Sequence, residues 1–528
     1  MLRQREVIYF LRGYSSGSRV KMKLSTKFLR MKFLRNETSF FSSTSHSAAK
    51  VEIGRQFTQI ASLENTLQRK KTFGQPTPES HPHLLKPGEL VPGFLLKEFK
   101  DRRESLAQKV LNVDHNSHHV IIIPSSCTQY MTEKIPYVFR QNSDFRYLTG
   151  CLEPESVLLM LISHDKLCES TLFVRQKSVH SELWEGPRTG VDNAPQFFGV
   201  DRAKPNSKLL EELYELKKAL DKFILWYDYS APVNSYVQQT VAKFVGDTKF
   251  EALVSVKSKI HEMRLIKSPA EQIVLKESAE IASRGIESAM AVTKPGLTEH
   301  HLFATVDYFC RINGAEHLAY PPVVATGTNA NTIHYIDNIQ QVKEGEMILM
   351  DSGCELHGYC SDITRTWPAN GKFTDPQKTL YDVVLSIQLE LIDKCLKKQV
   401  TLDELFKDMC NLLGKRLKEA HVLRKNAEGL KPNELGFELC PHHVGHYLGM
   451  DVHDTATINR DIPLKEGMLI TIEPGIYVKA GCALLRPEFH DMGIRIEDDV
   501  LIKGSGAEVI SNAVKTPTDI EKMCNSGK

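Results

Sequence analysis

Long hydrophobic runs are absent from this 528-residue sequence. The most apolar stretches, residues 120–123 and 157–162, have the length of strands and fall well short of the roughly 18 residues that a membrane-spanning helix needs. Net charge is also low, at +2, so composition offers no general case for nucleic-acid binding. We therefore expect neither a membrane nor a nucleic acid as a partner. The 41% hydrophobic and 25% charged residues are typical of a soluble globular protein with two or three domains.

Paired cysteine motifs are absent as well. The eleven cysteines are an odd number, they are scattered from Cys127 to Cys524, and no Cys-x-x-Cys spacing occurs. This pattern argues against a disulfide framework and against a thiolate zinc site. We expect mostly buried, reduced thiols, consistent with a cytosolic or mitochondrial matrix protein.

Acidic residues are scarce at the N-terminus. Residues 1–50 contain eleven lysines and arginines but only two acids, Glu6 and Glu37, a net charge of +9 that leaves −7 for the rest of the chain. Leucine and phenylalanine lie between the basic residues, and serine is frequent. This composition is typical of a mitochondrial transit peptide, with a disordered basic tail or a nucleic-acid-binding arm as the alternative. We predict that residues 1–50 direct the protein to the mitochondrion and lie outside the fold.

Residues 51–264 are predicted to form a first domain of the α/β class. It begins with a proline-containing stretch over residues 73–93, which we expect to be extended and to lie against the folded body. Short apolar segments and an amphipathic segment follow. They predict buried strands at residues 120–123, 157–162 and 171–174, and a helix at residues 211–223.

Residues 265–528 are predicted to form a second domain, which makes the whole chain α/β (α+β) in fold class. Ser268, Pro269 and Glu271 provide a helix start with a capping box, so we place the domain boundary at about residue 265. Three further helices are expected, starting at Thr298, near Asp375 and at Thr401.

A short internal similarity links two parts of the second domain. Residues 343–353 resemble residues 465–475, and in both segments a glycine turn precedes an apolar strand that ends in a carboxylate six residues after the glycine. The carboxylates are Asp351 and Glu473. Two related halves of a domain could each deliver an acid to a shared site, and a chance match of two common turn–strand units is the alternative.

Four acids of the second domain are candidates for one site. Asp351 and Asp362 stand eleven residues apart, and the glycine-containing segment between them suits a hairpin that would bring them together. Glu473 and Glu497 are expected within apolar strands. A buried carboxylate is costly unless it is paired or metal-bound. One such residue would indicate a salt bridge, whereas four favour a metal site.

Histidines cluster between residues 440 and 454. His442 and His446 have the spacing of a helical zinc pair, but the acid of the His-Glu-x-x-His motif is missing and Gly445 weakens a helix. We therefore expect a loop or strand that carries a ligand, although any one of these histidines could be structural. Four carboxylates and one imidazole would suit Mn²⁺, with Fe²⁺, Co²⁺ and Zn²⁺ as alternatives, and they suffice for two ions.

Several blocks of this sequence match a known family. The chain resembles the aminopeptidase P and prolidase group of metallopeptidases, whose catalytic domain has the pita-bread fold. The N-terminal blocks, at residues 137–145 and 147–150, look like the creatinase/aminopeptidase P-type N-terminal domain of that group. Residues 81–89 and 183–188 resemble a mitochondrial branch in particular. The catalytic blocks lie at residues 362–368, 445–449, 471–475 and 493–499.

The resemblance implies a role for each matched residue. The ligands of two divalent ions, which the family likeness suggests to be Mn²⁺, would be Asp351, Asp362, His446, Glu473 and Glu497. Asp362 and Glu497 would bridge both ions, and Glu473 would also transfer protons. His334 matches a gating histidine of the family. His442 and His453 match its substrate-contacting histidines, and Tyr477 and Arg495 match supporting residues.

The resemblance also implies an activity, the release of an N-terminal residue from peptides with proline at the second position, by a homodimer. An apolar pocket can select proline, because its ring has no amide N–H that needs an acceptor. The likeness extends to peptidases that trim one residue from mitochondrial proteins after presequence removal. Three alternatives stay open: a prolidase limited to dipeptides, a methionine aminopeptidase, which would not need the first domain, and a non-catalytic pita-bread binding protein, which the complete ligand set disfavours.

Overall fold

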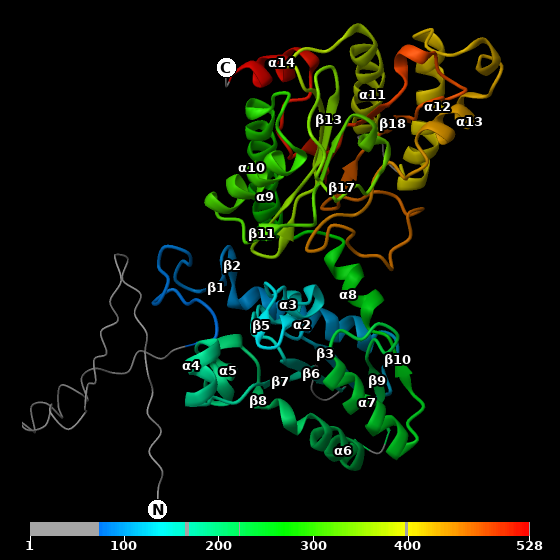
Figure 1. Ribbon diagram of the computed structural model, residues 1–528. Coiled ribbons are helices and arrows are strands. Elements are labelled where there is room, and N and C mark those ends of the chain that lie inside the picture. The colour runs from blue at the N-terminus through cyan, green and yellow to red at the C-terminus, as the bar shows by residue number, and fades with distance from the viewer. Residues whose placement is uncertain (1–72, 164–167, 221, 396–399, 527–528) are drawn as a thin grey trace, which may run out of the picture. The chain divides into compact units, whose positions relative to one another are not determined.

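A computed structural model describes residues 73–163, 168–220, 222–395 and 400–526 of the chain (Figure 1). The predicted transit peptide, residues 1–50, lies outside this part. We refer to residues 73–264 as the N-terminal region and to residues 265–526 as the C-terminal region, and the domain boundary near residue 265 stays a prediction. No helix of the described ranges combines the length and the apolarity required to cross a membrane. Most of the eleven cysteines are buried, as predicted.

The N-terminal region is built on a mixed six-stranded sheet with the order β10-β9-β3-β6-β7-β8. The three central strands pair antiparallel, whereas β9 joins β3 and β8 joins β7 in parallel. The predicted strands are confirmed as β3, β6 and β7. The six strands are β3 (His119–Pro124), β6 (Val157–Ile162), β7 (Glu169–Val174), β8 (Arg202–Pro205), β9 (Ile224–Trp226) and β10 (Leu253–Val254).

Helices cover both faces of this sheet (Figure 1). In β3, Val120 and Ile122 pack with α6 (Leu209–Leu220) and α7 (Ser235–Thr248), whereas Ile121 and Ile123 pack on the other side with α2 (Leu96–Leu111) and α3 (Ser143–Thr149). The strand is apolar throughout because neither face meets water. The predicted helix at residues 211–223 exists as α6, but its end was wrong. Phe223 lies beyond the helix, where its ring packs against Phe244 and Phe250 before the chain enters β9.

The prediction for the leader, residues 73–93, was correct about its position and wrong about its shape. It lies against the N-terminal region, since Phe73 stacks on Phe197 at 4.4 Å and the Gln75 side-chain amide donates to the carbonyl of Gly150. It is not extended, because the backbone amide of His81 closes a turn onto the carbonyl of Thr77. The remaining elements of the N-terminal region are β1 (Glu89–Val91), β2 (Phe94–Leu95), β4 (Tyr130–Thr132), β5 (Ile135–Pro136), α4 (Val179–Glu185), α5 (Gly190–Phe198), η1 (Asn206–Lys208) and α8 (Lys257–Arg264).

The C-terminal region consists of helices that pack around antiparallel sheets, as expected for the pita-bread fold. All four predicted helices are present, and each begins with the reciprocal side-chain and backbone bonds of a capping box. The helices are α9 (Pro269–Val292), α10 (Glu299–Ile312), α11 (Asp375–Lys394), α12 (Leu402–Glu419), α13 (Pro432–Leu439) and α14 (Pro517–Asn525), with short turns η2 (Gly327–Asn331), η3 (Lys425–Ala427) and η4 (Pro487–Phe489).

Four small sheets complete the C-terminal region. Their strand orders are β12-β13-β16, β17-β20-β21, β18-β19 and β11-β14-β15. The strands are β11 (His317–Leu318), β12 (Val323–Thr326), β13 (Met347–Asp351), β14 (Cys354–Leu356), β15 (Tyr359–Cys360), β16 (Thr364–Pro368), β17 (Leu469–Ile472), β18 (Gly475–Val478), β19 (Met492–Arg495), β20 (Asp498–Lys503) and β21 (Gly506–Val509).

The internal similarity of the sequence corresponds to two equivalent turn–strand units. Strands β13 and β17 each begin two residues after a glycine with positive φ, 80° at Gly345 and 86° at Gly467. A residue with a side chain rarely adopts this conformation, so glycine sets the start of each strand. Asp351 is the last residue of β13, and Glu473 directly follows β17. Both units therefore present a carboxylate where a buried strand ends.

Candidate metal centre

The first two acids of the site come from the strand end of β13 and the hairpin that follows it. Strands β14 and β15 form the predicted hairpin, which returns the chain so that Asp362 comes close to Asp351. The Tyr320 hydroxyl lies 2.5 Å from a carboxylate oxygen of each acid and can donate to only one of them at a time. The return is tight at Gly353, where a Cβ atom would lie 1.7 Å from the carbonyl oxygen of Ser361. Only glycine fits at this point.

Glu473 and Glu497 were predicted to lie within strands, and this placement was wrong. Glu473 comes immediately after β17, because Pro474 follows it and has no N–H to continue the ladder. Glu497 lies between β19 and β20, where its backbone amide donates to the carbonyl of Thr364. The Thr364 hydroxyl also donates to the carboxylate of Glu497, at 2.6 Å. Both carboxylates thus belong to strand ends, as Asp351 does.

His446 lies in a loop between α13 and β17, as predicted, and not on a helix. Its Nδ1 is 3.1 Å from the carbonyl oxygen of Tyr447, so Nδ1 carries the proton and Nε2 faces the acids. Nε2 is 3.3 Å from Asp362 and 3.6 Å from Glu473. Gly445 allows this approach, because a Cβ there would lie 2.0 Å from the carbonyl oxygen of Thr471.

These side chains form a concentrated group of donor atoms. Asp362, His446 and Glu497 each offer one ligand atom, and these atoms all lie within 4.8 Å of one another. Burial, followed by the charges of neighbouring carboxylates, raises the pKa of Glu497 well above its ordinary value and that of Glu473 to about 7. Burial alone would lower the pKa of His446, but the interactions with Asp362 and Glu473 outweigh the effect of burial and raise this pKa to about 9. The group therefore carries more negative charge than its surroundings neutralise.

Arg495 is the cation that contacts this acidic group directly. Its side chain is 2% exposed and donates to Asp351 at 2.5 Å, to the Tyr477 oxygen at 2.8 Å and to the Thr364 hydroxyl at 3.1 Å. Desolvation opposes the charge of a buried guanidinium, but these acceptors and the nearby acids keep its pKa above the ordinary value. Arg495 thus partly balances the carboxylates and holds Asp351 and Tyr477 in place.

His442 and Tyr477 form a second edge of the site. The Tyr477 hydroxyl is 2.8 Å from Nε2 of His442, and Nδ1 of His442 is 3.8 Å from Glu473. Burial, with the charge of Arg495, lowers the pKa of His442 to about 4, so the imidazole is neutral at physiological pH. Cys440 contacts the same Nε2 at 3.4 Å. Nδ1 of His442 lies 2.8 Å from the carbonyl oxygen of His443, so Nδ1 carries the proton and Nε2 accepts from the Tyr477 hydroxyl.

His453 and His334 lie at the margin of the site. The ring of His453 stands edge-on to that of His446, with 4.5 Å between centroids and an angle of 78°. His334 follows η2 and is exposed. Burial lowers the pKa of His453, and the charge of His446 adds to this shift. In the described residues, His334 has no hydrogen bond or ion pair with the other predicted site residues.

The structure adds two residues that were not predicted. Tyr320 contacts Asp351 and Asp362, and Glu299 holds the loop that carries His334 by accepting from the Tyr335 hydroxyl at 2.7 Å. Glu299 accepts further bonds from the backbone amides of Thr326 and Gln340. A buried glutamate at a helix start looks like an ordinary first-turn acid, and Tyr320 precedes two prolines without any repeated motif. Neither residue had a signal in the sequence.

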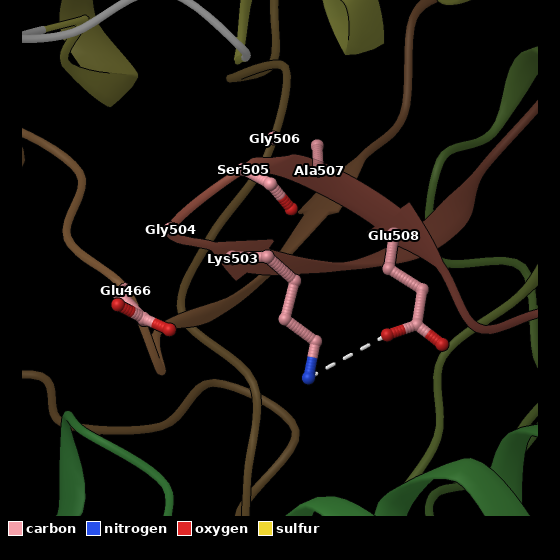
Figure 2. Close-up of a pocket in the computed structure, with 7 residues that line it drawn as sticks. All are labelled: Glu466, Lys503, Gly504, Ser505, Gly506, Ala507 and Glu508. Atoms are coloured by element: carbon pink, nitrogen blue, oxygen red, sulfur yellow. Dashed lines mark ion pairs between the residues drawn. The ribbon is translucent and has the colours of Figure 1, made fainter.

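The hollow at the β20–β21 turn is separate from this group of residues (Figure 2). It is lined by Glu466 and residues 503–508, and Lys503 pairs with Glu508 at 3.6 Å across it. None of the predicted site residues lines it. Two of its charged side chains, Lys503 and Glu508, pair with each other, so the hollow is not a candidate for the site.

Two family models match this chain. The model described as metallopeptidase family M24 matches residues 274–504, and the model described as aminopeptidase P, N-terminal domain matches residues 99–226. Each model falls within one of the two regions described above. The combination supports the pairing of an aminopeptidase P-type N-terminal fold with a pita-bread metallopeptidase fold.

Known proteins with both regions are similar over most of their length. Xaa-Pro aminopeptidase 3 of Rattus norvegicus is 40% identical over 86% of this chain and 90% of its own. Intermediate cleaving peptidase 55, mitochondrial, of Arabidopsis thaliana is also 40% identical, over 89% of this chain and 91% of its own. The crystal structure of Icp55 from Saccharomyces cerevisiae superposes with a TM-score of 0.74 at 31% identity, covering 84% of this chain and all of that one. This chain therefore belongs to metallopeptidase family M24, among the members that carry an aminopeptidase P N-terminal domain.

Proposed function

We propose that this protein is a mitochondrial aminopeptidase that releases the N-terminal residue from peptides with proline at the second position. The observation that carries the proposal is the convergence of Asp362, His446 and Glu497 within 4.8 Å, with Asp351 and Glu473 beside them. The name of the Rattus relative, Xaa-Pro aminopeptidase 3, supports the substrate class.

The donor set fits divalent metal ions. Its members are four carboxylates and one imidazole, a hard combination that suits Mn²⁺ and also Fe²⁺, Co²⁺ or Zn²⁺. The raised pKa values of Glu473 and Glu497 support this fit, because burial and the charges of neighbouring carboxylates outweigh the positive charge nearby. We propose that the carboxylates of Asp351, Asp362, Glu473 and Glu497 and Nε2 of His446 would hold two ions, most simply Mn²⁺, with Asp362 and Glu497 as ligands shared between the ions.

Each remaining residue then has a role in the reaction. When bound, the ions supply Lewis-acid polarisation and neutralise the charge that develops during peptide hydrolysis. Glu473 can accept a proton and return it to the leaving amine. His453 donates a hydrogen bond to the developing oxyanion, His334 orients a substrate carbonyl oxygen, and His442 contacts the substrate. Arg495 and Tyr477 hold Asp351 and His442 in position.

A second substrate class has its own support. The name of the Arabidopsis relative, Intermediate cleaving peptidase 55, mitochondrial, and the basic composition of residues 1–50 both favour action on mitochondrial proteins after presequence removal. Such trimming would not need proline. Mitochondrial targeting predicts that the mature protein begins between about residue 36 and residue 60, which N-terminal sequencing of the protein from isolated mitochondria tests. An intact Met1 inside the organelle would contradict it.

A peptide library incubated with Mn²⁺-loaded protein tests the proposed function. Product masses should show loss of one N-terminal residue from peptides of three or more residues with proline second. Cleavage restricted to dipeptides would indicate a prolidase instead, and loss of one residue without regard to proline would indicate the trimming activity. Absence of cleavage in every peptide, with two ions bound, would favour a pita-bread binding protein. A homodimer in solution remains a proposal that sedimentation would test.

A further inference from the structure

The side chain of His453 is not held by hydrogen bonds of its own. Across the part of the chain that the structure describes, no residue forms a hydrogen bond with its ring, and the residue is exposed. Its edge-on contact with His446 is the one ring contact it makes there. The place of this imidazole must therefore be set by the backbone on either side of it.

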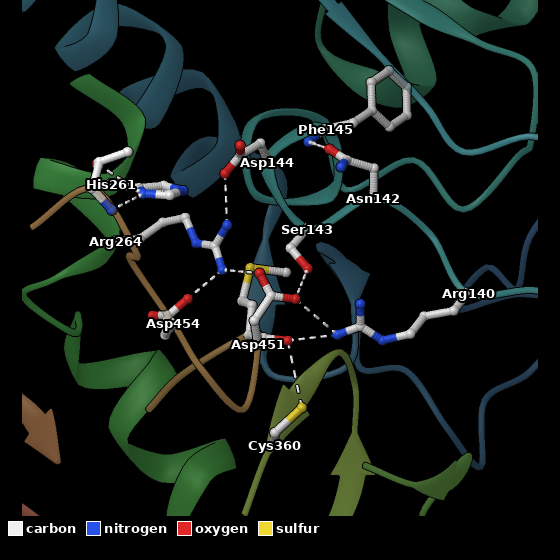
Figure 3. Close-up of polar contacts among 12 residues, drawn as sticks. Arg140, Asn142, Ser143, Asp144, Phe145, His261, Arg264, Cys360, Asp451 and Asp454 are labelled. Carbon is white, nitrogen blue, oxygen red and sulfur yellow. Dashed lines mark hydrogen bonds and ion pairs between the residues drawn. The ribbon is translucent and has the colours of Figure 1, made fainter. Parts of the chain in front are cut away.

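Two carboxylates flank His453 in the sequence, and one arginine binds both. Arg264, at the end of α8, donates from Nη2 to Asp451 at 2.8 Å and to Asp454, and from Nη1 to Asp144 at 2.6 Å (Figure 3). The Arg264 side chain is only 2% exposed. Charge-assisted bonds of a buried guanidinium are strong and directional, so the two ends of this short segment are fixed in relation to α8 and α3.

Residues elsewhere in the chain also bind the segment that contains His453. Arg140 donates from Nη2 to the carbonyl oxygen of Met450 at 2.7 Å and to Asp451 at 3.2 Å. The Ser143 hydroxyl donates to Asp451 at 2.7 Å, and Lys267 donates to the second oxygen of Asp454 at 3.2 Å. Figure 3 shows Arg264 and Arg140 approaching Asp451 from different sides. Arg140 and Ser143 belong to the N-terminal region, so that region holds a segment of the candidate site.

We propose that Arg264 is a positioning residue for His453 and that the N-terminal region contributes to turnover through it. The inference rests on the proposed function, because it concerns the imidazole assigned to the oxyanion. A planar guanidinium can bind Asp451, Asp454 and Asp144 together, whereas the single ammonium group of lysine cannot hold three carboxylates in one geometry. The Arg264→Lys variant therefore keeps the positive charge but loses the simultaneous bonds to the three carboxylates.

A double-mutant cycle with His453 tests this positioning role. Arg264→Lys should lower kcat about 10-fold or more while KM for a proline-containing tripeptide stays within about 2-fold. His453→Ala should lower kcat by about 10²–10³. If Arg264 acts through His453, the double variant should match His453→Ala within about 2-fold. Losses that multiply in the double variant would overturn the proposal, as would wild-type kcat in Arg264→Lys.

Arg102 provides a matched control. It is also a buried arginine of the N-terminal region that reaches the C-terminal region, where it pairs with Glu271 at 3.6 Å and contacts the Tyr359 hydroxyl. No hydrogen bond or ion pair joins it to residues 451–454 in the described ranges. Arg102→Met should lower the melting temperature and leave kcat within about 2-fold of wild type. An equal loss of kcat in this variant would show a general loosening and would overturn the specific role of Arg264.

Two further outcomes separate this inference from the proposed function. If Arg264→Lys does not fold, Asp451→Asn replaces it in the cycle, because this change removes one flanking carboxylate and leaves the arginine in place. Wild-type protein without aminopeptidase activity would defeat the proposed function. Active wild-type protein in which the Asp451→Asn or Arg264→Lys change leaves kcat unaltered would defeat the positioning role alone.

Discussion

The carboxylates of the candidate site repel one another more than the nearby cation can offset. Arg495 partly neutralises Asp351, yet burial beside other acids raises the pKa values of Asp351, Glu473 and Glu497. Buried carboxylates of this kind are stable when a cation joins them. At the residue scale, the main expectation is therefore that metal binding and the ionisation of these acids depend on each other.

Asp362 is the residue whose loss should affect the metal most. In Asp362→Asn the side chain keeps its size but loses the charge that we propose contacts both ions. Bound metal should fall to a small fraction of the wild-type content and turnover should fall at least about 10²-fold, while unfolding stays cooperative. Elemental analysis and thermal unfolding of one preparation check this. Full metal content in this variant would contradict the proposed bridging role.

Substitution of His453 should lower the catalytic rate without changing the metal content. A donor that acts mainly in the transition state lowers kcat more than it raises KM, and loss of one such donor typically costs about 10²–10³ in rate. We expect His453→Ala to behave in this way with near-normal metal content, whereas His446→Ala should lose metal. A structural histidine would instead lower the melting temperature and leave kcat near wild type. Measurements of kcat, metal content and melting temperature on the same samples separate the two roles.

At the scale of elements, the hairpin between Asp351 and Asp362 depends on Gly353. A Cβ at this position would lie 1.7 Å from the carbonyl oxygen of Ser361, so Gly353→Ala must displace the returning strand and Asp362 with it. We expect loss of metal and a lower melting temperature. Gly246→Ala in α7 is the control, because nothing lies within 4 Å of its added Cβ and alanine favours a helix by about 0.5–1 kcal/mol. Unchanged metal content in Gly353→Ala would contradict the account.

Local signals in the sequence were sufficient to predict many of the helices and strands. The capping boxes at Ser268 and Thr401 are short-range patterns, so α9 and α12 start where predicted. Apolar runs without charge likewise predicted the central strands of the six-stranded sheet. The glycine turns at Gly345 and Gly467 predicted two strands that end near acids.

Features that depend on tertiary pairing could not be predicted in this way. Tyr320 reaches Asp351 because β12 pairs with β13 in the register that places Val323 opposite Asp351, and no local pattern specifies that register. The placement of Glu473 and Glu497 inside strands failed because hydrophobic neighbours do not reveal where a ladder ends. The ion pair between Arg264 and Asp451 joins residues 187 apart in the sequence, which only the folded chain brings together.

At the scale of the whole molecule, the contact between the N-terminal and C-terminal regions should depend on pH. Burial alone would raise the pKa of Asp451, but the charges of Arg264 and Arg140, with the Ser143 hydroxyl, outweigh it and hold the pKa well below its ordinary value. A depressed carboxyl pKa contributes stability that is complete above the unfolded pKa of about 3.9 and is lost as pH falls toward the folded pKa. This contribution should therefore weaken below about pH 4.

A comparison of two variants isolates this contribution. The melting temperature of Asp451→Asn should lie below that of wild type at pH 6, and the gap should narrow as pH falls from 5 to 3. Asp101→Asn is the control, because Asp101 is exposed and pairs with Lys97 on the surface, where ion pairs contribute little. Its melting temperature should stay close to wild type at every pH. A gap for Asp451→Asn that widens on acidification would contradict the assignment.

We propose that strand-end acids hold divalent ions with which the protein removes a residue in front of proline. The most direct test is the mass of the products from two tripeptides that differ only in proline or alanine at the second position, with protein before and after metal removal and after Mn²⁺ reloading. We predict that the first residue is released from the proline peptide, that chelation abolishes release, and that Mn²⁺ restores it. Release that persists in metal-free protein, or a product other than the single N-terminal residue, would contradict the account.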